Sequence, residues 1–253
     1  MTTSISISER TVGELAVEMP ISIRVFESWK IDYCCGGKTP LPEAVEAAGK
    51  SVEAFVEELE KLSTGSSEGR DWQKDTLTEM SAAIVSTYHA FTREELATFQ
   101  PLAAKVHSVH GDRRPELAEV KKLVGELSGD MLPHMLKEEQ VLFPYVEQME
   151  KGQPTTPFFG TVRNPVRMMM LEHDRVGELL ARLREITEEF TPPESACFSY
   201  RELYRRLAEF ETLTHEHIHV ENNLYFPRAI ALEDRAGETA DFASCSMSAP
   251  CGH

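Results

Sequence analysis

The segment HIHVENNLYFP, residues 217–227, has a counterpart earlier in the chain, HMLKEEQVLFP, residues 134–144. In both segments a glutamate follows the first histidine by four residues, and Phe-Pro follows it by nine and ten. Upstream, His89 and His173 precede these two histidines by 45 and 44 residues. The repeat predicts two helical hairpins, each with one histidine on its first arm and H-x-x-x-E on its second.

This spacing predicts a metal centre. Residues four apart lie on one face of a helix, so the histidine and glutamate of each second arm can reach one centre together. Two hairpins packed face to face would form a bundle core with a dinuclear carboxylate site, in which the glutamates bridge two metals and the imidazoles cap them. No cysteine belongs to the set, and mixed imidazole and carboxylate ligands favour iron, with manganese or zinc as alternatives. The predicted ligands from the repeat are His89, His134, Glu138, His173, His217 and Glu221.

A fifth histidine is predicted to join this set. On a helical wheel, His110 lies on the same face as the apolar Phe99 and Ala103, whereas His107 lies to one side. The second hairpin has FTPPE, residues 190–194, at the equivalent offset. We therefore expect His110 to be an extra ligand and the site to be asymmetric, with an open coordination position.

The helical register places the histidines that alternate before Glu221 on two different faces of the helix. In a helix, His217 and Glu221 share a face with apolar residues, and the matching segment at 134–144 selects the same register. His215 and His219 then point to the opposite side. We expect these two histidines to be expendable.

The whole chain is predicted to be all-α, because long segments have a period near 3.6 and none alternates convincingly with period 2. We expect a small helical unit at 1–63, a linker at 64–72, an up-down bundle at 73–234 and a mobile tail at 235–253. Pro101 and Pro133 should kink or break their helices. The long helices of the bundle are predicted at 74–91, 94–110, 116–149, 161–189 and 195–233.

Composition limits the partners and the compartment. The net charge is -16, so phosphate backbones and anionic lipids are repelled, and neither nucleic acid nor a membrane surface is an expected partner. No apolar run has the length of a membrane span, and the N-terminus lacks a secretory signal pattern. The five cysteines have no disulfide-framework spacing, so we expect a cytoplasmic, thiol-reducing compartment.

Cys34 and Cys35 are adjacent within DYCCGG, residues 32–37. Neighbouring cysteines seldom form a structural disulfide and lack the C-x-x-C spacing of a zinc site. A nearby helix N-terminus should lower a thiol pKa here. One interpretation is a reactive thiol pair that accepts iron, NO or electrons, or exchanges disulfides; the other is a small buried pair that packs a tight turn. Cys245 and Cys251, in the tail, are interpreted as incidental.

Together, the histidine–glutamate repeat and the upstream DYCCGG resemble the repair of iron centres family, the ScdA/YtfE type, which has a hemerythrin-like di-iron fold. The resemblance extends over residues 9–233 and implies that His89, His110, His134, Glu138, His173, His217 and Glu221 bind two irons, with an oxo or hydroxo bridge between them. It also places Cys34 and Cys35 in the family's short N-terminal domain.

The resemblance further implies a cytoplasmic stress protein that restores iron–sulfur clusters damaged by nitric oxide or peroxide, by donating iron. Its partners would be proteins with damaged or apo clusters, and the small molecules NO and O₂. A sensor that binds O₂ or NO, and an enzyme that reduces NO or a peroxide, would use the same ligands, so whether the chain is an enzyme stays open. A homodimer is also expected.

Overall fold

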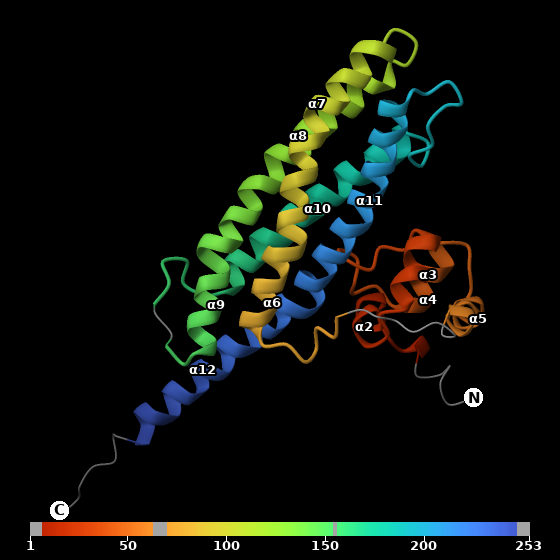
Figure 1. Cartoon of the computed structure of the whole chain (residues 1–253). Coiled ribbons are helices and arrows are strands. Elements are labelled where there is room, and N and C mark those ends of the chain that lie inside the picture. The colour runs from red at the N-terminus through yellow and green to blue at the C-terminus, as the bar shows by residue number, and fades with distance from the viewer. Residues whose placement is uncertain (1–6, 63–69, 154–155, 247–253) are drawn as a thin grey trace, which may run out of the picture.

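The chain folds into a long helical bundle with a small helical domain at its side (Figure 1). The computed structural model describes residues 7–62, 70–153 and 156–246, and describes side chains as far as residue 236. Within these ranges the regular elements are all helices, and the only β-type pairing is an isolated bridge between Thr11 and Pro40. The predicted fold class, an all-α up-down bundle preceded by a small helical domain, is confirmed.

Four long rods form the bundle, with α7 packed on α8 and α11, and α10 packed on α8 and α11. Three of the rods contain a π-helical turn, labelled η. The first rod is α6 (Leu77–Ile84), η1 (Val85–His89) and α7 (Ala90–His110); the second is α8 (Glu116–Lys137), η2 (Glu138–Leu142) and α9 (Phe143–Glu150); the third is α10 (Arg163–Ile186); the fourth is α11 (Phe198–Val220), η3 (Glu221–Tyr225) and α12 (Phe226–Ser246).

The helix boundaries differ from the prediction in three places. The first rod runs from Leu77 to His110 without the break expected near residue 92. Pro101 and Pro133 lie inside α7 and α8 and end neither helix. A proline removes one backbone hydrogen bond, and burial of apolar neighbours along each rod outweighs that cost. The fourth rod continues to Ser246, so the chain stays helical beyond residue 235, where the sequence pattern is lost. Of the linker expected at 64–72, residues 64–69 lie outside the described residues.

The N-terminal domain has its own apolar core, in which Phe26 stacks on Tyr33 and Phe55. Thr11 and Glu14 form a capping box at the start of the helix that begins at Val12, in which each side chain accepts a hydrogen bond from the other residue's backbone N–H. Its helices are α2 (Val12–Glu18), α3 (Ser22–Trp29), α4 (Leu41–Ala47) and α5 (Val52–Leu62).

This domain docks against α11 and η3 of the bundle. Asn223 donates a hydrogen bond of 3.0 Å to the carbonyl of Tyr33. A Cβ atom at Gly37 would lie 2.4 Å from the Asn223 Oδ1 atom, so a larger residue here would force the Asn223 side chain to move. The docked arrangement places the loop that contains the paired cysteines beside the fourth rod.

The prediction that His215 and His219 are expendable is wrong. His219 is buried, its ring lies 5.4 Å from that of Tyr33, and its Nδ1 atom lies 2.9 Å from the Asn223 amide nitrogen. His215 Nδ1 lies 3.0 Å from a carboxylate oxygen of Glu27 on α3. Both point away from the bundle core, as expected, but that side of α11 is the docking surface for the N-terminal domain.

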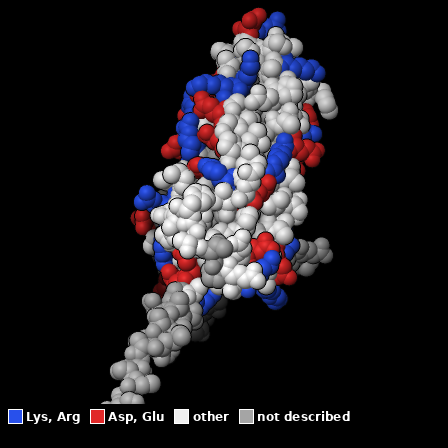
Figure 2. Space-filling view, turned by 90° about the vertical axis from the view of Figure 1, so that its left-hand side faces the viewer, with Lys and Arg blue, Asp and Glu red and all other residues white. Residues whose placement is uncertain are grey.

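Charged residues cover the outside of the bundle in mixed groups. Figure 2 shows basic and acidic side chains next to one another on one long side of the molecule, with wide uncharged areas between them. Cross-helix ion pairs of Arg182 with Glu119 and of Arg175 with Glu126 join α10 to α8. Among the described residues, no helix is long and apolar enough to span a membrane.

The repeat extends to the helix caps. Glu150, twelve residues after Glu138, accepts hydrogen bonds of 2.8 Å from the backbone N–H groups of Leu77 and Thr78 at the start of α6. Glu233, twelve residues after Glu221, accepts a 2.8 Å bond from the backbone N–H of Val162 at the start of α10. Each second arm therefore carries a carboxylate that caps the first arm of its own hairpin, where the helix dipole also favours a negative charge.

We predict that Glu150→Gln lowers the free energy of unfolding by about 1–2 kcal/mol at neutral pH, because it removes a charge-assisted helix cap. Burial works to raise the pKa of Glu150, but the hydroxyl and backbone N–H of Thr78 lower it overall below 4.5. A carboxyl with a depressed pKa stabilises the fold above its unfolded pKa, and this contribution is lost as the pH falls through the folded value.

Urea denaturation at pH 7 and at pH 3.5 would measure this, with Glu147→Gln as the control. Glu147 lies one turn earlier on α9 and pairs only with Lys151 at the surface, a contact of small energetic value. An equal loss of stability at both pH values, or an equal loss in the control, would contradict the capping role.

Candidate metal centre

Four imidazoles and two carboxylates converge between the arms of the two hairpins. Glu138 is the first residue of η2 and Glu221 is the first residue of η3, while His89 is the last residue of η1. Wider π-helical turns are frequent at functional sites because they shift side chains out of the regular α-helical register. The six residues are nearly or fully inaccessible to solvent: His89, His134, Glu138, His173, His217 and Glu221.

The six side chains form two groups of four that share both glutamates. The first group is His89, His217, Glu138 and Glu221; the second is His134, His173 and the same two glutamates. Within each group the potential ligand atoms all lie within 4.8 Å of one another. The sharing of both carboxylates is the arrangement that two adjacent metal ions bridged by carboxylates require.

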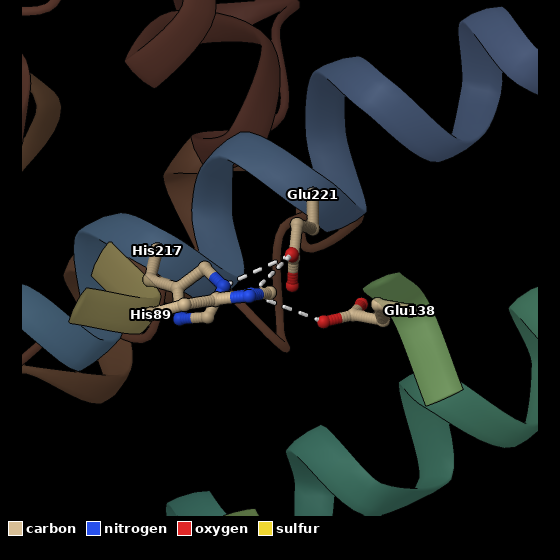
Figure 3. Close-up of side chains that lie close together, drawn as sticks. All are labelled: His89, Glu138, His217 and Glu221. Carbon is tan, nitrogen blue, oxygen red and sulfur yellow. Dashed lines mark hydrogen bonds and ion pairs between the residues drawn. The ribbon is translucent and has the colours of Figure 1, made fainter. Parts of the chain in front are cut away.

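Figure 3 shows the first group, in which His89 and His217 lie next to one another and Glu138 and Glu221 approach them from opposite rods. His217 Nε2 lies 2.9 Å from Glu221 Oε1, and His89 Nε2 lies 3.3 Å from Glu138 Oε2. Each group takes one histidine from each hairpin, so neither hairpin can form a group alone.

In the second group, His134 Nε2 and His173 Nε2 face each other at 3.0 Å. The same nitrogens lie 3.4 Å from Glu138 Oε2 and 3.2 Å from Glu221 Oε2, respectively. Two imidazole nitrogens at this distance repel each other unless a proton or a cation lies between them.

The Phe-Pro motif of the repeat has a structural explanation. Phe143 stacks on His89 with an angle of 17° between the rings, and Phe226 stacks on His173 with an angle of 9°. Each phenylalanine therefore fixes the ring plane of the first-arm histidine in its own hairpin. Tyr88, which precedes His89, stacks on His217 at 10°.

The sequence did not predict the hydrogen-bond partners of the histidine Nδ1 atoms. Nδ1 of His89 lies 2.7 Å from Glu139, and Nδ1 of His134 lies 2.8 Å from Glu172. Nδ1 of His173 lies 2.9 Å from the side-chain oxygen of Asn222. Such partners hold a ligating imidazole with its Nδ1 protonated and its Nε2 free for a metal.

The signal for two of these partners was present in the repeat. Glu139 directly follows Glu138, and Asn222 directly follows Glu221. Both therefore occupy the same place in their hairpins. Glu172 comes from the other hairpin and has no such signal, because the corresponding residue is Tyr88.

Burial disfavours the charged forms of the side chains in this site and shifts their pKa values. Burial and the facing Glu221 carboxylate raise the pKa of Glu138. Burial works to raise the pKa of Glu221 as well, but the neighbouring imidazoles of His217 and His173 hold it below its usual range. Burial and the neighbouring His217 lower the pKa of His89 to about 4, so this imidazole is neutral at pH 7 and its lone pair can bind a metal.

The donor set fits a metal. Among the described side chains, both carboxylate oxygens of Glu138, Oε2 of Glu221 and Nε2 of His89 are buried without a hydrogen-bond partner. An unpaired buried carboxylate costs several kcal/mol, and a bound cation removes this cost. Six converging imidazole and carboxylate donors without a thiolate suit iron or another first-row metal.

His110 is not part of this centre, and the prediction that it is a ligand there is corrected by the structure. It lies 21 residues beyond His89 on a continuous helical rod, which corresponds to about 30 Å along the axis. Its Nε2 atom lies 3.1 Å from Cys197 Sγ, and its ring lies 5.4 Å from that of Tyr200. The helical wheel gave the correct face but carries no information on distance along the rod.

Cys34 and Cys35 are free thiols beside the fourth rod, with 3.9 Å between their Sγ atoms. Asp32 Oδ1 accepts hydrogen bonds from both backbone N–H groups and lies 3.3 Å from Cys34 Sγ. The interaction with Cys35, burial and the Asp32 carboxylate raise the pKa of Cys34, so the expected lowering by a helix N-terminus is wrong. The next helix, α4, begins only at Leu41. The side chains of Cys245 and Cys251 lie outside the described residues.

Comparison with known proteins agrees with this geometry. Residues 80–229 match the hemerythrin HHE cation-binding domain, and residues 8–63 match the ScdA_N domain of unknown function. The iron-sulfur cluster repair protein YtfE of Yersinia pseudotuberculosis (strain IP 31758) is 38% identical over 225 residues, which cover 87% of this chain and 96% of that protein. YtfE of Yersinia pestis (strain Pestoides F) is 37% identical over the same length and coverage.

The chain belongs to the YtfE family of hemerythrin-domain proteins. The predicted family is thereby confirmed. The HHE match spans both hairpins and contains all six converging residues, and the ScdA_N match contains the cysteine pair.

We predict that Glu138→Gln and Glu221→Gln each lower metal affinity more than His89→Ala, because each glutamate belongs to both groups of four and each histidine to one. The expected loss for the glutamate variants is at least roughly 10-fold. Anaerobic loading with Fe(II), followed by desalting and a metal count per chain, would measure it.

The matched control is His110→Ala, which removes a histidine from the same rod as His89 but far from the centre. It should bind as much iron as the unmodified chain. Loss of iron in this control, or full retention in both glutamate variants, would overturn the assignment of the site.

Proposed function

We propose that this chain is a di-iron protein that repairs damaged iron–sulfur clusters by donating iron. The observation that carries the proposal is the pair of four-residue groups that share Glu138 and Glu221. The relatives that are 37–38% identical over nearly their whole length carry the name iron-sulfur cluster repair protein, which supports the same reaction for this chain.

In this proposal, Glu138 and Glu221, which belong to both groups, would hold two irons as a pair. His89 and His217 would hold one iron, and His134 and His173 would hold the other. Bound iron would supply a centre that accepts and gives up electrons, since imidazole and carboxylate donors accommodate both ferrous and ferric ions. Glu139, Glu172 and Asn222 keep the imidazoles of His89, His134 and His173 oriented. Phe143 and Phe226 restrict the rotation of two of these rings, those of His89 and His173.

Donation requires that iron leave this set of ligands for a softer one. Asp32, Cys34 and Cys35 form a third group whose ligand atoms lie within 4.8 Å of one another, on the domain that docks beside the fourth rod. Thiolates are the ligands that iron–sulfur clusters use. We propose that this thiol pair receives iron before it passes to a protein with a damaged or apo cluster.

A second function uses the same centre. Two histidines and two shared glutamates give each iron four protein donors, which leaves room for a small ligand such as NO or O₂. A sensor that binds these molecules, or an enzyme that reduces NO, would therefore need no further residues at the metals. Binding of NO or O₂, a response to nitrosative or oxidative stress, and formation of a homodimer stay predictions. Among the described side chains, Cys34, Cys35 and Cys197 are free thiols, which supports a reducing compartment such as the cytoplasm.

The test of donation uses a purified iron–sulfur protein from which the cluster has been removed, with sulfide supplied. We expect the iron-loaded chain to restore the acceptor's visible absorption and activity, and to do so in the presence of a chelator that blocks restoration by free Fe(II). Glu138→Gln should fail, and His110→Ala should restore the acceptor as the unmodified chain does.

Two outcomes would contradict the proposal. If the chelator abolishes restoration by the loaded chain, iron passes through solution and the chain is not a direct donor. If the loaded chain holds its iron but reduces NO steadily with an electron donor and restores no cluster, the enzymatic function replaces the proposed one.

A further inference from the structure

The two hairpins differ in the hydrogen bond made by Nδ1 of the first-arm histidine. In the first hairpin, the carboxylate of Glu139 accepts from Nδ1 of His89 and also from Arg93, at 2.7 Å each. In the second hairpin, Asn222 occupies the place of Glu139, and its side-chain oxygen lies 2.9 Å from Nδ1 of His173. The amide nitrogen of Asn222 donates a 3.2 Å hydrogen bond to the backbone carbonyl of Cys34.

The residue that corresponds to Arg93 is a glycine. Arg93 follows His89 by four residues, and Gly177 follows His173 by four residues. A Cβ atom at Gly177 would lie 3.9 Å from Cys35 Sγ, so an arginine side chain here would extend into the cysteine loop. The loop thus occupies the space that Arg93 fills in the first hairpin.

The cysteine loop is packed into the bundle at this point. Cys34 is buried within the apolar cluster of the bundle, together with Val176 of α10, and Cys35 packs against the same cluster. A cleft of about 430 Å³ lies between the loop and the bundle, and its lining includes Cys34, Cys35, Asp174 and Gly177. The thiols therefore lie at the boundary between the docked loop and the bundle.

We propose that Asn222 is a positioning residue that couples the metal centre to the cysteine pair. The inference rests on the metal centre proposed above. A metal on Nε2 of His173 requires the proton to be on Nδ1, which then donates to the Asn222 oxygen. This turns the amide nitrogen toward Cys34 and makes its hydrogen bond to the loop.

Without a metal, the proton of His173 can move to Nε2, and Nδ1 then becomes an acceptor. The Asn222 amide would turn its nitrogen toward His173 and its oxygen toward the carbonyl of Cys34, where two acceptors repel each other. The amide thus has two orientations, and metal binding selects the one that holds the loop closed. Because linkage is reciprocal, a closed loop also favours metal binding.

The experiment measures alkylation of Cys34 and Cys35 by a maleimide, followed by mass spectrometry of the peptide that contains both. Iron per chain is counted in the same samples, which are loaded anaerobically and desalted. We expect metal to slow alkylation in the unmodified chain by roughly 5-fold or more, in the usual range of coupling between two sites.

Asn222→Asp separates the two hydrogen bonds. Aspartate still accepts from His173, as Glu139 does from His89, but it has no donor for the Cys34 carbonyl. This variant should retain iron, and its thiols should react at one fast rate with and without metal. Protection caused by iron bound directly to the thiols would persist in this variant, and that result would overturn the proposal.

His110→Ala is the control, since it removes a histidine that lies on the same rod as His89 but far from the metal centre. It should keep the metal-dependent protection of the thiols. A chain that binds no iron would overturn the metal centre and this inference together. If the unmodified chain binds iron but its thiols are alkylated at equal rates with and without metal, the coupling alone is overturned.

Discussion

The structure depends on two carboxylates buried side by side in the middle of a helical bundle. Glu138 and Glu221 are fully inaccessible to solvent, and the bundle offers them imidazoles in place of lysine or arginine. Burying two carboxylates side by side is costly without a cation between them, and burial keeps the adjacent imidazole of His89 neutral at pH 7. Bound metal ions would therefore lower the free energy of the folded bundle by compensating the buried carboxylates.

The internal repeat explains how a single chain builds this arrangement. Each hairpin supplies a first-arm histidine, a second-arm histidine and glutamate, a phenylalanine stacked on the first-arm histidine, and a terminal glutamate that caps the first arm. Each metal-binding group nevertheless mixes residues of both hairpins. The hairpins must therefore pack together before either group exists, which ties metal binding to the fold of the whole bundle.

The sequence predicted the helical class and the six converging residues because both follow from periodicity and from the repeat. It failed for His110, since a helical wheel reports the face of a residue but not its position along a rod that is tens of ångströms long. It failed for His215 and His219 because their partners, Glu27 and Tyr33, are nearly 200 residues away, and no local pattern reports such docking. The π-helical turns were also missed, because one extra residue in a turn is too small a change to register in the hydrophobic period.

The two halves of the bundle differ where the second hairpin meets the N-terminal domain. Glu139 is an anion satisfied by Arg93 within the bundle, whereas Asn222 is neutral and presents both a donor and an acceptor. An amide can accept from His173 and donate to a backbone carbonyl at the same time, which an ionised carboxylate cannot. Gly37 of the docked domain lacks a side chain where it faces Asn223 of the fourth rod, and Gly177 of α10 lacks one where it faces Cys35. The departures from symmetry in the repeat therefore gather on the side that faces the cysteine pair, as expected if that domain is part of the metal centre's function.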